Sequence, residues 1–215
     1  EIRGLRVKYL SADPSNAENG QVWYNSTSGN LRVQGIGLQS VTSGSPLITA
    51  RNGAAGAGIQ TAALAFGGDV SPPITNLTEE YNGSGWAVGG TLNTGRKDFG
   101  GAGTQTAGLG CGGFRPSPTN AVSDITGEYD GTNWTTGGSM VQAINGGFAS
   151  GSQTDAVFFG GANPDITNQA QTYDGTSWVS SANLATARTS LAGSSTTGAS
   201  ALAAGGNIPG SPANT

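Results

Sequence analysis

The stretch GEYDGTNWTTGG, residues 127–138, has two further versions in the chain: EEYNGSGWAVGG at residues 79–90 and QTYDGTSWVSSA at residues 171–182. In each version a tyrosine precedes an Asn-Gly or Asp-Gly pair, and a tryptophan follows the tyrosine by five residues. These pairs favour tight two-residue hairpin turns, because both turn positions need positive φ. The stretch therefore predicts three β-hairpins, each with its tyrosine and tryptophan on one face as diagonal neighbours.

Two further marks follow the same period as the hairpins. Short apolar runs end in double glycines at Gly68, Gly113, Gly161 and Gly206, which are 45, 48 and 45 residues apart. An arginine follows the tryptophan by ten residues at Arg96 and Arg188, Arg51 stands in the equivalent place before the first hairpin, and Ile144 replaces the arginine in the middle. A period of about 45 residues is typical of one four-stranded propeller blade.

Each unit divides into four expected strands. In the first unit these are a small-residue strand from Asn52, an apolar strand from Thr61, a strand ending at Tyr81 and an outer strand from Gly85. One such sheet cannot bury its aromatic face alone, so we expect the next sheet to cover it. The tryptophans are interpreted as core between the sheets, with a sugar-stacking platform as the alternative.

The pattern of apolar residues, Gly-Gly, a spaced Tyr and Trp, and then Arg resembles the kelch repeat, over about residues 51–215. The resemblance implies an all-β fold of kelch-like β-propeller blades, with three full four-stranded blades and part of a fourth. The units start near residues 51, 96, 144 and 188, and the last is incomplete, which favours a longer natural chain. The short Gly-, Ala- and Thr-rich hairpins resemble kelch-type repeats of bacteriophage and marine viral structural proteins.

The first 46 residues lack the repeat. The stretch ENGQVWYNSTSGNLRV, residues 18–33, predicts a hairpin of strands QVWY and LRV, and it resembles a short β motif of phage tail-fibre and virion proteins. We therefore expect an N-terminal attachment segment at residues 1–46 and propeller blades at residues 47–215. Because a two-stranded hairpin is marginal alone, one or both of the rings of Trp23 and Tyr24 are expected to bury against a partner chain or the first blade, and both residues are expected to serve assembly.

Composition argues against several functions. The net charge of −4 provides no basic surface for nucleic acid, and no apolar run is long enough for a membrane helix. The chain has no histidine and a single cysteine, Cys111, so neither a catalytic metal nor any other cofactor is expected. Glycine-rich stretches near Gly53 and Gly101 follow the repeat period and lack a following helix, which argues against a phosphate-binding loop. The repeated arginines are interpreted as hydrogen-bond donors between blades, with anion binding as the alternative.

The variable parts of the repeat are the loops after the double glycines, at residues 69–76, 114–124 and 162–169. We expect these loops to cluster on one propeller face, where loops on a rigid scaffold commonly bind; surface filler is the alternative. Candidate binding residues are Pro72, Pro73, Phe114, Arg115, Pro116, Asn163 and Asp165.

The expected function is that of a non-enzymatic virion structural or adhesion protein, such as a phage tail-fibre, tail-associated or decoration component. Its expected partners are other virion proteins, copies of itself, and a host-surface glycan or protein receptor, with no nucleic acid and no membrane insertion. The expected location is the virion. A secreted or surface carbohydrate-binding module of a bacterium is the alternative, and an enzyme on a propeller scaffold is the third hypothesis.

Overall fold

The computed structural model describes residues 7–16, 21–33, 44–70, 73–116 and 121–210. The chain forms two compact units, residues 1–43 and residues 44–215, and each is described by itself. Both are built from β-strands, and the described ranges contain no helix. Consequently, no described helix is available that could cross a membrane.

The smaller unit contains a three-stranded sheet in the order β1-β2-β3. Its strands are β1 (Lys8–Leu10), β2 (Val22–Asn25) and β3 (Asn30–Val33). The predicted hairpin is confirmed as β2 and β3, which pair antiparallel. The sequence did not reveal β1, which pairs parallel to β2 from more than ten residues away.

The larger unit contains three four-stranded sheets and one two-stranded sheet, each with its strands in chain order. All of the pairings in these sheets are antiparallel. The repeat predicted three four-stranded sheets and part of a fourth, which matches this arrangement. The first sheet has β4 (Ala55–Ile59), β5 (Ala62–Phe66), β6 (Thr78–Tyr81) and β7 (Trp86–Val88); the second has β8 (Gly100–Thr104), β9 (Ala107–Cys111), β10 (Thr126–Tyr129) and β11 (Trp134–Thr136); the third has β12 (Phe148–Gly151), β13 (Ala156–Phe159), β14 (Ala170–Tyr173) and β15 (Trp178–Ser181); the fourth has β16 (Ala192–Thr197) and β17 (Ser200–Ala204).

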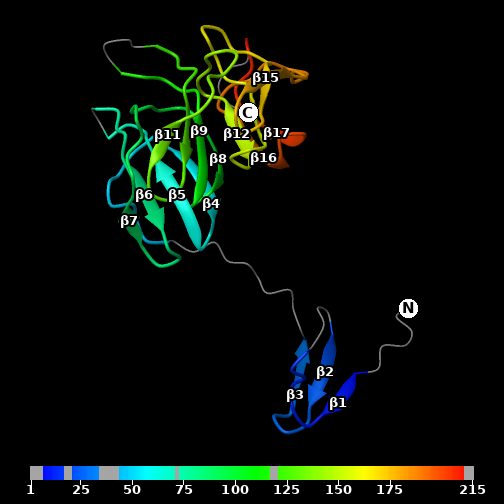
Figure 1. Cartoon of the computed structure of the whole chain (residues 1–215). Coiled ribbons are helices and arrows are strands. Elements are labelled where there is room, and N and C mark those ends of the chain that lie inside the picture. Colours follow the sequence, from blue (N-terminus) through cyan, green and yellow to red (C-terminus); the bar gives the residue numbers. More distant parts are fainter. Residues whose placement is uncertain (1–6, 17–20, 34–43, 71–72, 117–120, 211–215) are drawn as a thin grey trace. The chain divides into compact units, whose positions relative to one another are not determined.

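Successive sheets pack through their first strands. β4 contacts β8, β8 contacts β12, and β12 contacts β16 (Figure 1). The small residues of these strands permit a close approach of backbones. A Cβ atom added to Gly101 of β8 would lie 2.4 Å from the carbonyl oxygen of Gly56 in β4, well inside contact distance. The glycine-rich composition of the first strands is therefore a packing requirement.

The hairpin in the opening stretch differs from the predicted two-residue turn. Tyr129 pairs directly with Trp134, so the loop between them has four residues. The side chain of Asp130 accepts hydrogen bonds from the backbone N–H groups of Thr132 at 2.8 Å and Asn133 at 2.7 Å. This side-chain capping stabilises the wider loop, and it makes the two aromatic residues direct partners instead of diagonal ones. Their rings lie 5.0 Å apart.

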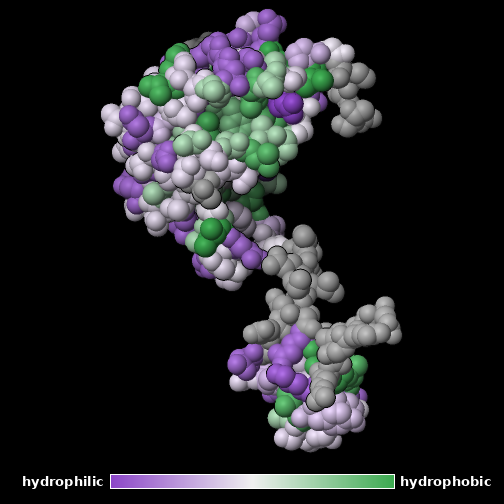
Figure 2. Space-filling view, turned by 90° about the vertical axis from the view of Figure 1, so that its right-hand side faces the viewer, coloured by the Kyte–Doolittle hydropathy of each residue, from purple (hydrophilic) through white to green (hydrophobic). Residues whose placement is uncertain are grey.

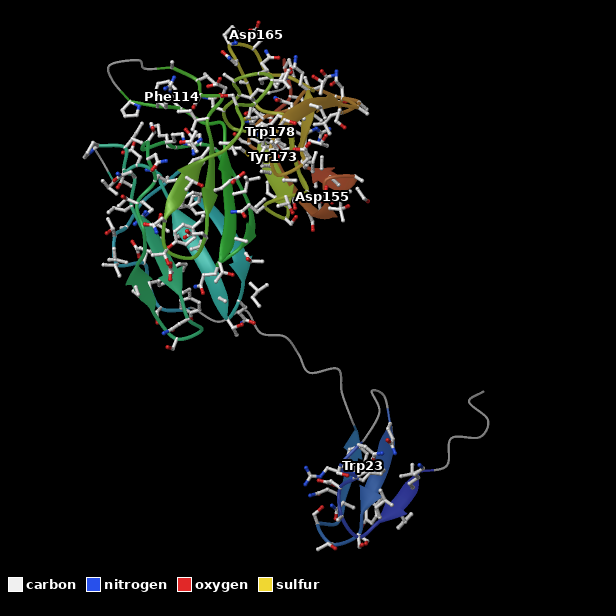
Figure 3. All side chains as sticks on the ribbon, in the orientation of Figure 1. Trp23, Phe114, Asp155, Asp165, Tyr173 and Trp178 are labelled. Atoms are coloured by element: carbon white, nitrogen blue, oxygen red, sulfur yellow. The ribbon has the colours of Figure 1, made fainter. Side chains whose placement is uncertain are left out.

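The second and third tyrosine and tryptophan pairs form the contact between sheets, as predicted, whereas Trp86 of the first pair is half-buried and donates to the carbonyl oxygen of Ser45. Trp134 and Trp178 are each 5% exposed. The indole Nε1 of Trp134 donates to Thr78 Oγ1 in the preceding sheet at 2.9 Å, and Trp178 donates to Thr126 Oγ1 at 2.8 Å. Figure 3 shows Tyr173 and Trp178 side by side within the larger unit. Burial at the interface excludes the sugar-stacking alternative for both tryptophans.

The repeat arginines hydrogen-bond within their own repeat unit. The expectation that they form hydrogen bonds between blades is therefore wrong. Arg96 is 1% exposed, and its guanidinium donates to the carbonyl oxygens of Gly110 in β9, Gly112 just after β9, and Ile125 just before β10. Burial is the largest cause that lowers the pKa of Arg96, to about 10, so the group is charged at neutral pH. Arg51, which precedes β4, forms an ion pair with Glu79 in β6 of the same repeat unit.

The tyrosine hydroxyls add a second contact between sheets. Tyr173 donates to Glu128 Oε1 at 2.5 Å and accepts from the backbone N–H of Gly138 at 3.3 Å. Burial first, and then the hydrogen bond to Glu128, raise the pKa of Tyr173 to about 12 from its ordinary value of 10.0. The neutral phenol is therefore the form that the fold stabilises.

We expect alkaline pH to remove the contribution of this hydroxyl. Because the pKa of Tyr173 is higher in the folded state, its stabilisation is complete below pH 10.0 and disappears as the pH rises to about 12. The difference in unfolding free energy between the wild type and Tyr173→Phe should shrink over this interval. Denaturant titrations of both proteins across it measure the difference. A difference that stays constant would contradict the assignment.

Candidate functional site

The predicted binding loops share one anchoring arrangement at the same end of their sheets. Each loop follows the second strand of its sheet, and the residue after the double glycine bridges backward to the segment before the first strand and forward to the returning chain. Asp69, Phe114 and Ala162 hold this position. Figure 3 shows Phe114 and Asp165 at one end of the larger unit, on two of these loops. We call the surface formed by the described parts of residues 69–76, 114–124 and 162–169 the loop face.

Some of the predicted loop residues are anchors. The backbone of Phe114 bridges to both Lys97 and Val122, and the side chain is half-buried. Asn163 donates from Nδ2 to the carbonyl oxygen of Ala143 at 2.7 Å. Both residues therefore hold the base of a loop in place.

The other candidates differ in exposure. Pro73 and Asp165 are exposed, whereas Arg115 and Pro116 are half-buried. The Nε of Arg115 is buried and has no hydrogen-bond partner among the described residues. Pro72 lies outside the described residues. Of these candidates, Pro73 and Asp165 are the ones most open to a ligand.

A depression of 440 Å³ lies where the four units converge, and the sequence did not predict it. Each unit contributes one equivalent residue to its lining: Gly53, Asp98, Gly146 and Ser190. Backbone hydrogen bonds link these four residues from one unit to the next. The N–H groups of Asp98, Gly146 and Ser190 each donate to the carbonyl oxygen of the equivalent residue in the preceding unit, at 2.9, 2.8 and 2.8 Å. The described lining residues are Gly53, Ala54, Asp98, Phe99, Asn145, Gly146, Gly147, Thr189 and Ser190.

The four residues that these hydrogen bonds link all have a left-handed backbone conformation. Gly53 and Gly146 have φ of 59° and 65°, and Asp98 and Ser190 adopt φ of 54° and 55° despite having side chains. Left-handed conformation is unfavourable for residues other than glycine and occurs often at functional sites. Here it places a carboxylate and a hydroxyl at the depression.

Residues that line the depression directly follow, in sequence, residues that pair with the loops. Asn52, Lys97, Asn145 and Thr189 pair with the first loop residues, and the next residue of each segment lines the depression. Lys97 Nζ also forms an ion pair with Asp69 Oδ2 at 3.0 Å, which joins the first loop to the second unit. The described parts of the loop face therefore adjoin a polar hollow.

The chemistry of the depression suits hydrogen bonding to a ligand. Asp98 contributes the one carboxylate among its described lining residues, and Asn145, Thr189 and Ser190 contribute amide and hydroxyl groups. Glycoside hydrolysis typically requires two carboxylates across the scissile bond, and the described lining residues do not supply the second. No cluster of potential metal ligands occurs within the described ranges of the chain.

The smaller unit carries a different surface, an exposed aromatic row. Tyr9, Tyr24 and Leu31 pair directly across β1, β2 and β3, so their side chains lie on one face of the sheet. Tyr9 is 76% exposed, Leu31 is 65% exposed, and the rings of Tyr9 and Tyr24 lie 4.8 Å apart. We call Tyr9, Tyr24 and Leu31 the aromatic row.

The opposite face of this sheet is closed by its own residues. Trp23 is 5% exposed, and its Nε1 donates to Asp13 Oδ1 at 2.8 Å. Asn25 donates to the same oxygen at 2.8 Å. The hydrogen bond from Asn25, followed by that from Trp23, lowers the pKa of Asp13 below its ordinary value. Trp23 is thus buried within the smaller unit, contrary to the expectation that it needs a partner, whereas Tyr24 lies on the open face. Tyr9 and Leu31 were missed because their pairing with Tyr24 depends on β1 and on the register of β3.

Comparison with known proteins identifies a similar fold and no family. No protein-family model matches the sequence, and no curated protein matches it. Among solved structures, 149 chains resemble this one. One of them, described as "Structure of YjhT", superposes with a TM-score of 0.61 over 87% of this chain and 68% of that chain, at 14% sequence identity. At this identity the likeness shows a shared all-β architecture alone.

Proposed function

We propose that this protein is a non-enzymatic virion structural or adhesion component, built from kelch-like propeller blades on an N-terminal attachment sheet. In this proposal the aromatic row docks onto another virion protein or another copy of the chain. The loop face is directed to a receptor on the host surface. The protein would act in the virion, as a tail-fibre, tail-associated or decoration component.

The aromatic row carries the proposal. A small three-stranded sheet gains little by exposing Tyr9 and Leu31 beside the half-buried Tyr24, since burying a leucine side chain alone would contribute roughly 1.5–3 kcal/mol. Contiguous exposed apolar surface on a soluble protein commonly marks an interface. The smaller unit buries Trp23 on one face and leaves the aromatic row on the other, which supports an assembly role for the exposed face.

The depression supports a hydroxylated receptor, such as a surface glycan. Asp98 is exposed, and Thr189 and Ser190 present hydroxyls within the same hollow. Sugars are bound through several directional hydrogen bonds, for which carboxylates, amides and hydroxyls are suitable partners. The same observation favours the second candidate function, a secreted or surface carbohydrate-binding module of a bacterium.

The test separates attachment from receptor binding. We expect Tyr9→Ser, Tyr24→Ser and Leu31→Ser, combined, to reduce incorporation into the particle by roughly tenfold or more, because interface aromatics often dominate binding energy. Trp23 is left unchanged because it is buried in the sheet. Incorporation is measured by quantifying the protein in purified particles.

Two control variants complete the experiment. Val88→Ser, at a side chain that is 69% exposed on the first sheet, should leave incorporation unchanged. Replacing residues 116–120 by a Gly-Ser turn keeps the Phe114 bridge and should leave incorporation intact while changing adsorption to host cells. If the loop replacement blocks incorporation and the change in the aromatic row does not, the proposed orientation is wrong.

A further inference from the structure

The third repeat unit contains a hollow of 250 Å³ beside the chain that leads into its first strand. Most of its lining residues carry amide or hydroxyl groups, namely Gln142, Gln169, Gln171, Ser180 and Asn183, and none of the described lining residues is charged. Ser180 and Asn183 are exposed, so the hollow is open to solvent. Figure 2 shows hydrophilic surface gathered at the end of the larger unit where Figure 1 places β15.

In the first unit the equivalent place is occupied by the repeat arginine. Arg51 donates to the carbonyl oxygen of Leu77 at 2.9 Å, and its guanidinium also donates to Glu79 Oε1. The same carboxylate oxygen accepts from the backbone N–H of Thr49 at 3.0 Å. One backbone oxygen and one side-chain oxygen of the third strand and its approach therefore hold this guanidinium.

The third unit keeps the backbone acceptor but has no arginine to donate to it. Ile144 stands at the arginine position, is fully buried and has no donor in its side chain. The carbonyl oxygen of Gln169 accepts from the N–H of Gly160 at 2.9 Å, as that of Leu77 accepts from the N–H of Gly67 at 2.9 Å. Leu77 also accepts from the arginine, whereas the Gln169 carbonyl has no second donor within the described part of the chain.

The side-chain acceptor is also kept, in an uncharged form. Gln171 is 2% exposed and corresponds to Glu79 in the strand register. Its Oε1 accepts from the backbone N–H of Gln142 at 3.3 Å, and its Nε2 donates to the carbonyl oxygen of Gln142 at 3.2 Å. Glu79 Oε1 accepts from both a backbone N–H and the guanidinium. An amide oxygen has two lone pairs, so Gln171 Oε1 retains room for one further donor.

The second unit shows that a guanidinium can be held here without a carboxylate. Gly127 takes the place of Glu79 in the strand register, and a Cβ atom on it would lie 3.4 Å from the Nη2 of Arg96. Arg96 donates instead to carbonyl oxygens, including that of Ile125, the counterpart of Leu77. The absence of a carboxylate from the hollow therefore does not exclude a guanidinium.

The entrance to this place also differs between the second and third units. In the second unit Asn93 Nδ2 donates to Thr136 Oγ1 at 3.2 Å, which links the incoming chain to the outer strand. Val141 and Ser180 hold these two positions in the third unit. Valine cannot donate, so this link is missing, and both residues line the hollow instead.

We propose that this hollow binds the guanidinium group of an arginine, supplied by a polypeptide or as the free amino acid. Two guanidinium N–H groups would donate to the carbonyl oxygen of Gln169 and to Gln171 Oε1, as Arg51 donates to Leu77 and Glu79. A planar group with several fixed N–H donors suits two neighbouring acceptors better than an ammonium does. The net charge of −4 favours a cationic ligand. The hollow shares no residue with the depression or the aromatic row, so this site is separate from both.

Matched probes test the proposal by nuclear magnetic resonance titration. One is the end-capped peptide Gly-Gly-Arg-Gly-Gly, the second has citrulline in place of arginine, and the third is free arginine. Citrulline has nearly the same shape as arginine but carries no charge. We expect the arginine peptide to shift the signals of the Gln142 backbone N–H and the Gln171 side-chain amide. It should bind about fivefold or more tightly than the citrulline peptide, because charge-assisted hydrogen bonds are roughly twice as strong as neutral ones.

Three variants locate the binding in the hollow. Ser180→Leu, at an exposed lining residue, should weaken binding of the arginine peptide about tenfold or more. Ser181→Leu, at the next residue of β15 and on its opposite face, should leave binding unchanged. Gln171→Glu, which restores the carboxylate of the first unit, should strengthen binding of the arginine peptide about tenfold and leave that of the citrulline peptide unchanged. Circular dichroism melting curves establish that each variant is folded.

The outcomes separate the ligand sources and the contrary results. Tighter binding of the peptide than of free arginine supports the proposal with a polypeptide as the source, and equal binding supports it with the free amino acid as the source. If the citrulline peptide binds as tightly as the arginine peptide, the hollow does not recognise a guanidinium and the proposal is overturned. It is equally overturned if millimolar arginine peptide leaves the signals of Gln142 and Gln171 unchanged, or if Ser180→Leu does not weaken binding.

Discussion

Trp134→Ala is expected to lower the unfolding free energy by about 3–5 kcal/mol, the range for truncating a large aromatic residue in a packed core. Trp134 is 5% exposed, and its ring lies 4.8 Å from that of Phe66 in the preceding sheet. The substitution also leaves Thr78 without its indole donor, which sits at 2.9 Å. Both losses fall on the contact between two sheets, so we expect one cooperative transition at a lower temperature.

Trp86 provides the matched control, because it occupies the same position of the repeat in the first sheet. It is half-buried, and its Nε1 donates to the carbonyl oxygen of Ser45 at 3.0 Å. Trp86→Ala should therefore destabilise the protein clearly less than Trp134→Ala. Denaturant titration of both variants measures the difference. Equal losses, or an unchanged melting curve for Trp134→Ala, would contradict the assignment of Trp134 to the core between sheets.

Arg96→Ala is expected to cost roughly 3 kcal/mol or more of unfolding free energy. The guanidinium donates to Gly112 O at 3.1 Å, to Gly110 O at 3.4 Å and to Ile125 O, and it lies over the ring of Phe99 at 5.1 Å. Each buried carbonyl that loses its donor costs about 1–3 kcal/mol. Removing the buried desolvated charge offsets part of this loss, which keeps the expected total below the sum of the separate costs.

Arg188 is the control for this second change. It stands at the same repeat position, is half-buried, and donates, among the described residues, to one carbonyl, that of Gly205, at 2.8 Å. Arg188→Ala should lower stability by about 1 kcal/mol or less, since one hydrogen bond typically contributes about 0.5–1.5 kcal/mol. Thermal and denaturant unfolding of the two variants compare them directly. If both arginines contribute equally, burial of the guanidinium is not the source of its effect.

The strand content was predictable because its signals are local. Apolar runs that end in Gly-Gly and hairpins that start at tyrosine lie within a few residues of the strands they specify, and the structure confirms four-stranded antiparallel sheets at each full repeat. The turn of the opening hairpin was predicted with the wrong register. Asp130 caps two backbone N–H groups and thereby favours a four-residue loop, an interaction that competes with the two-residue turn that Asp-Gly usually favours.

The candidate surfaces were less predictable, because each joins residues far apart in the chain. The depression combines Gly53, Asp98, Gly146 and Ser190, which are linked by hydrogen bonds between separate units. The aromatic row requires the parallel pairing of β1 with β2, for which no short turn provides a signal.

The sequence by itself determined the repeat, its period, the all-β class and the role of Trp134 and Trp178 in the core between sheets. Periodicity and turn preference act over a few residues, so they are visible without a structure. Only the tertiary structure decided that Trp23 is buried while Tyr9 and Leu31 are exposed on the other face, and that Arg96 donates to carbonyl groups of its own repeat unit. These outcomes depend on which strand packs against which, and that is set by non-local contacts whose partners no single stretch of sequence specifies.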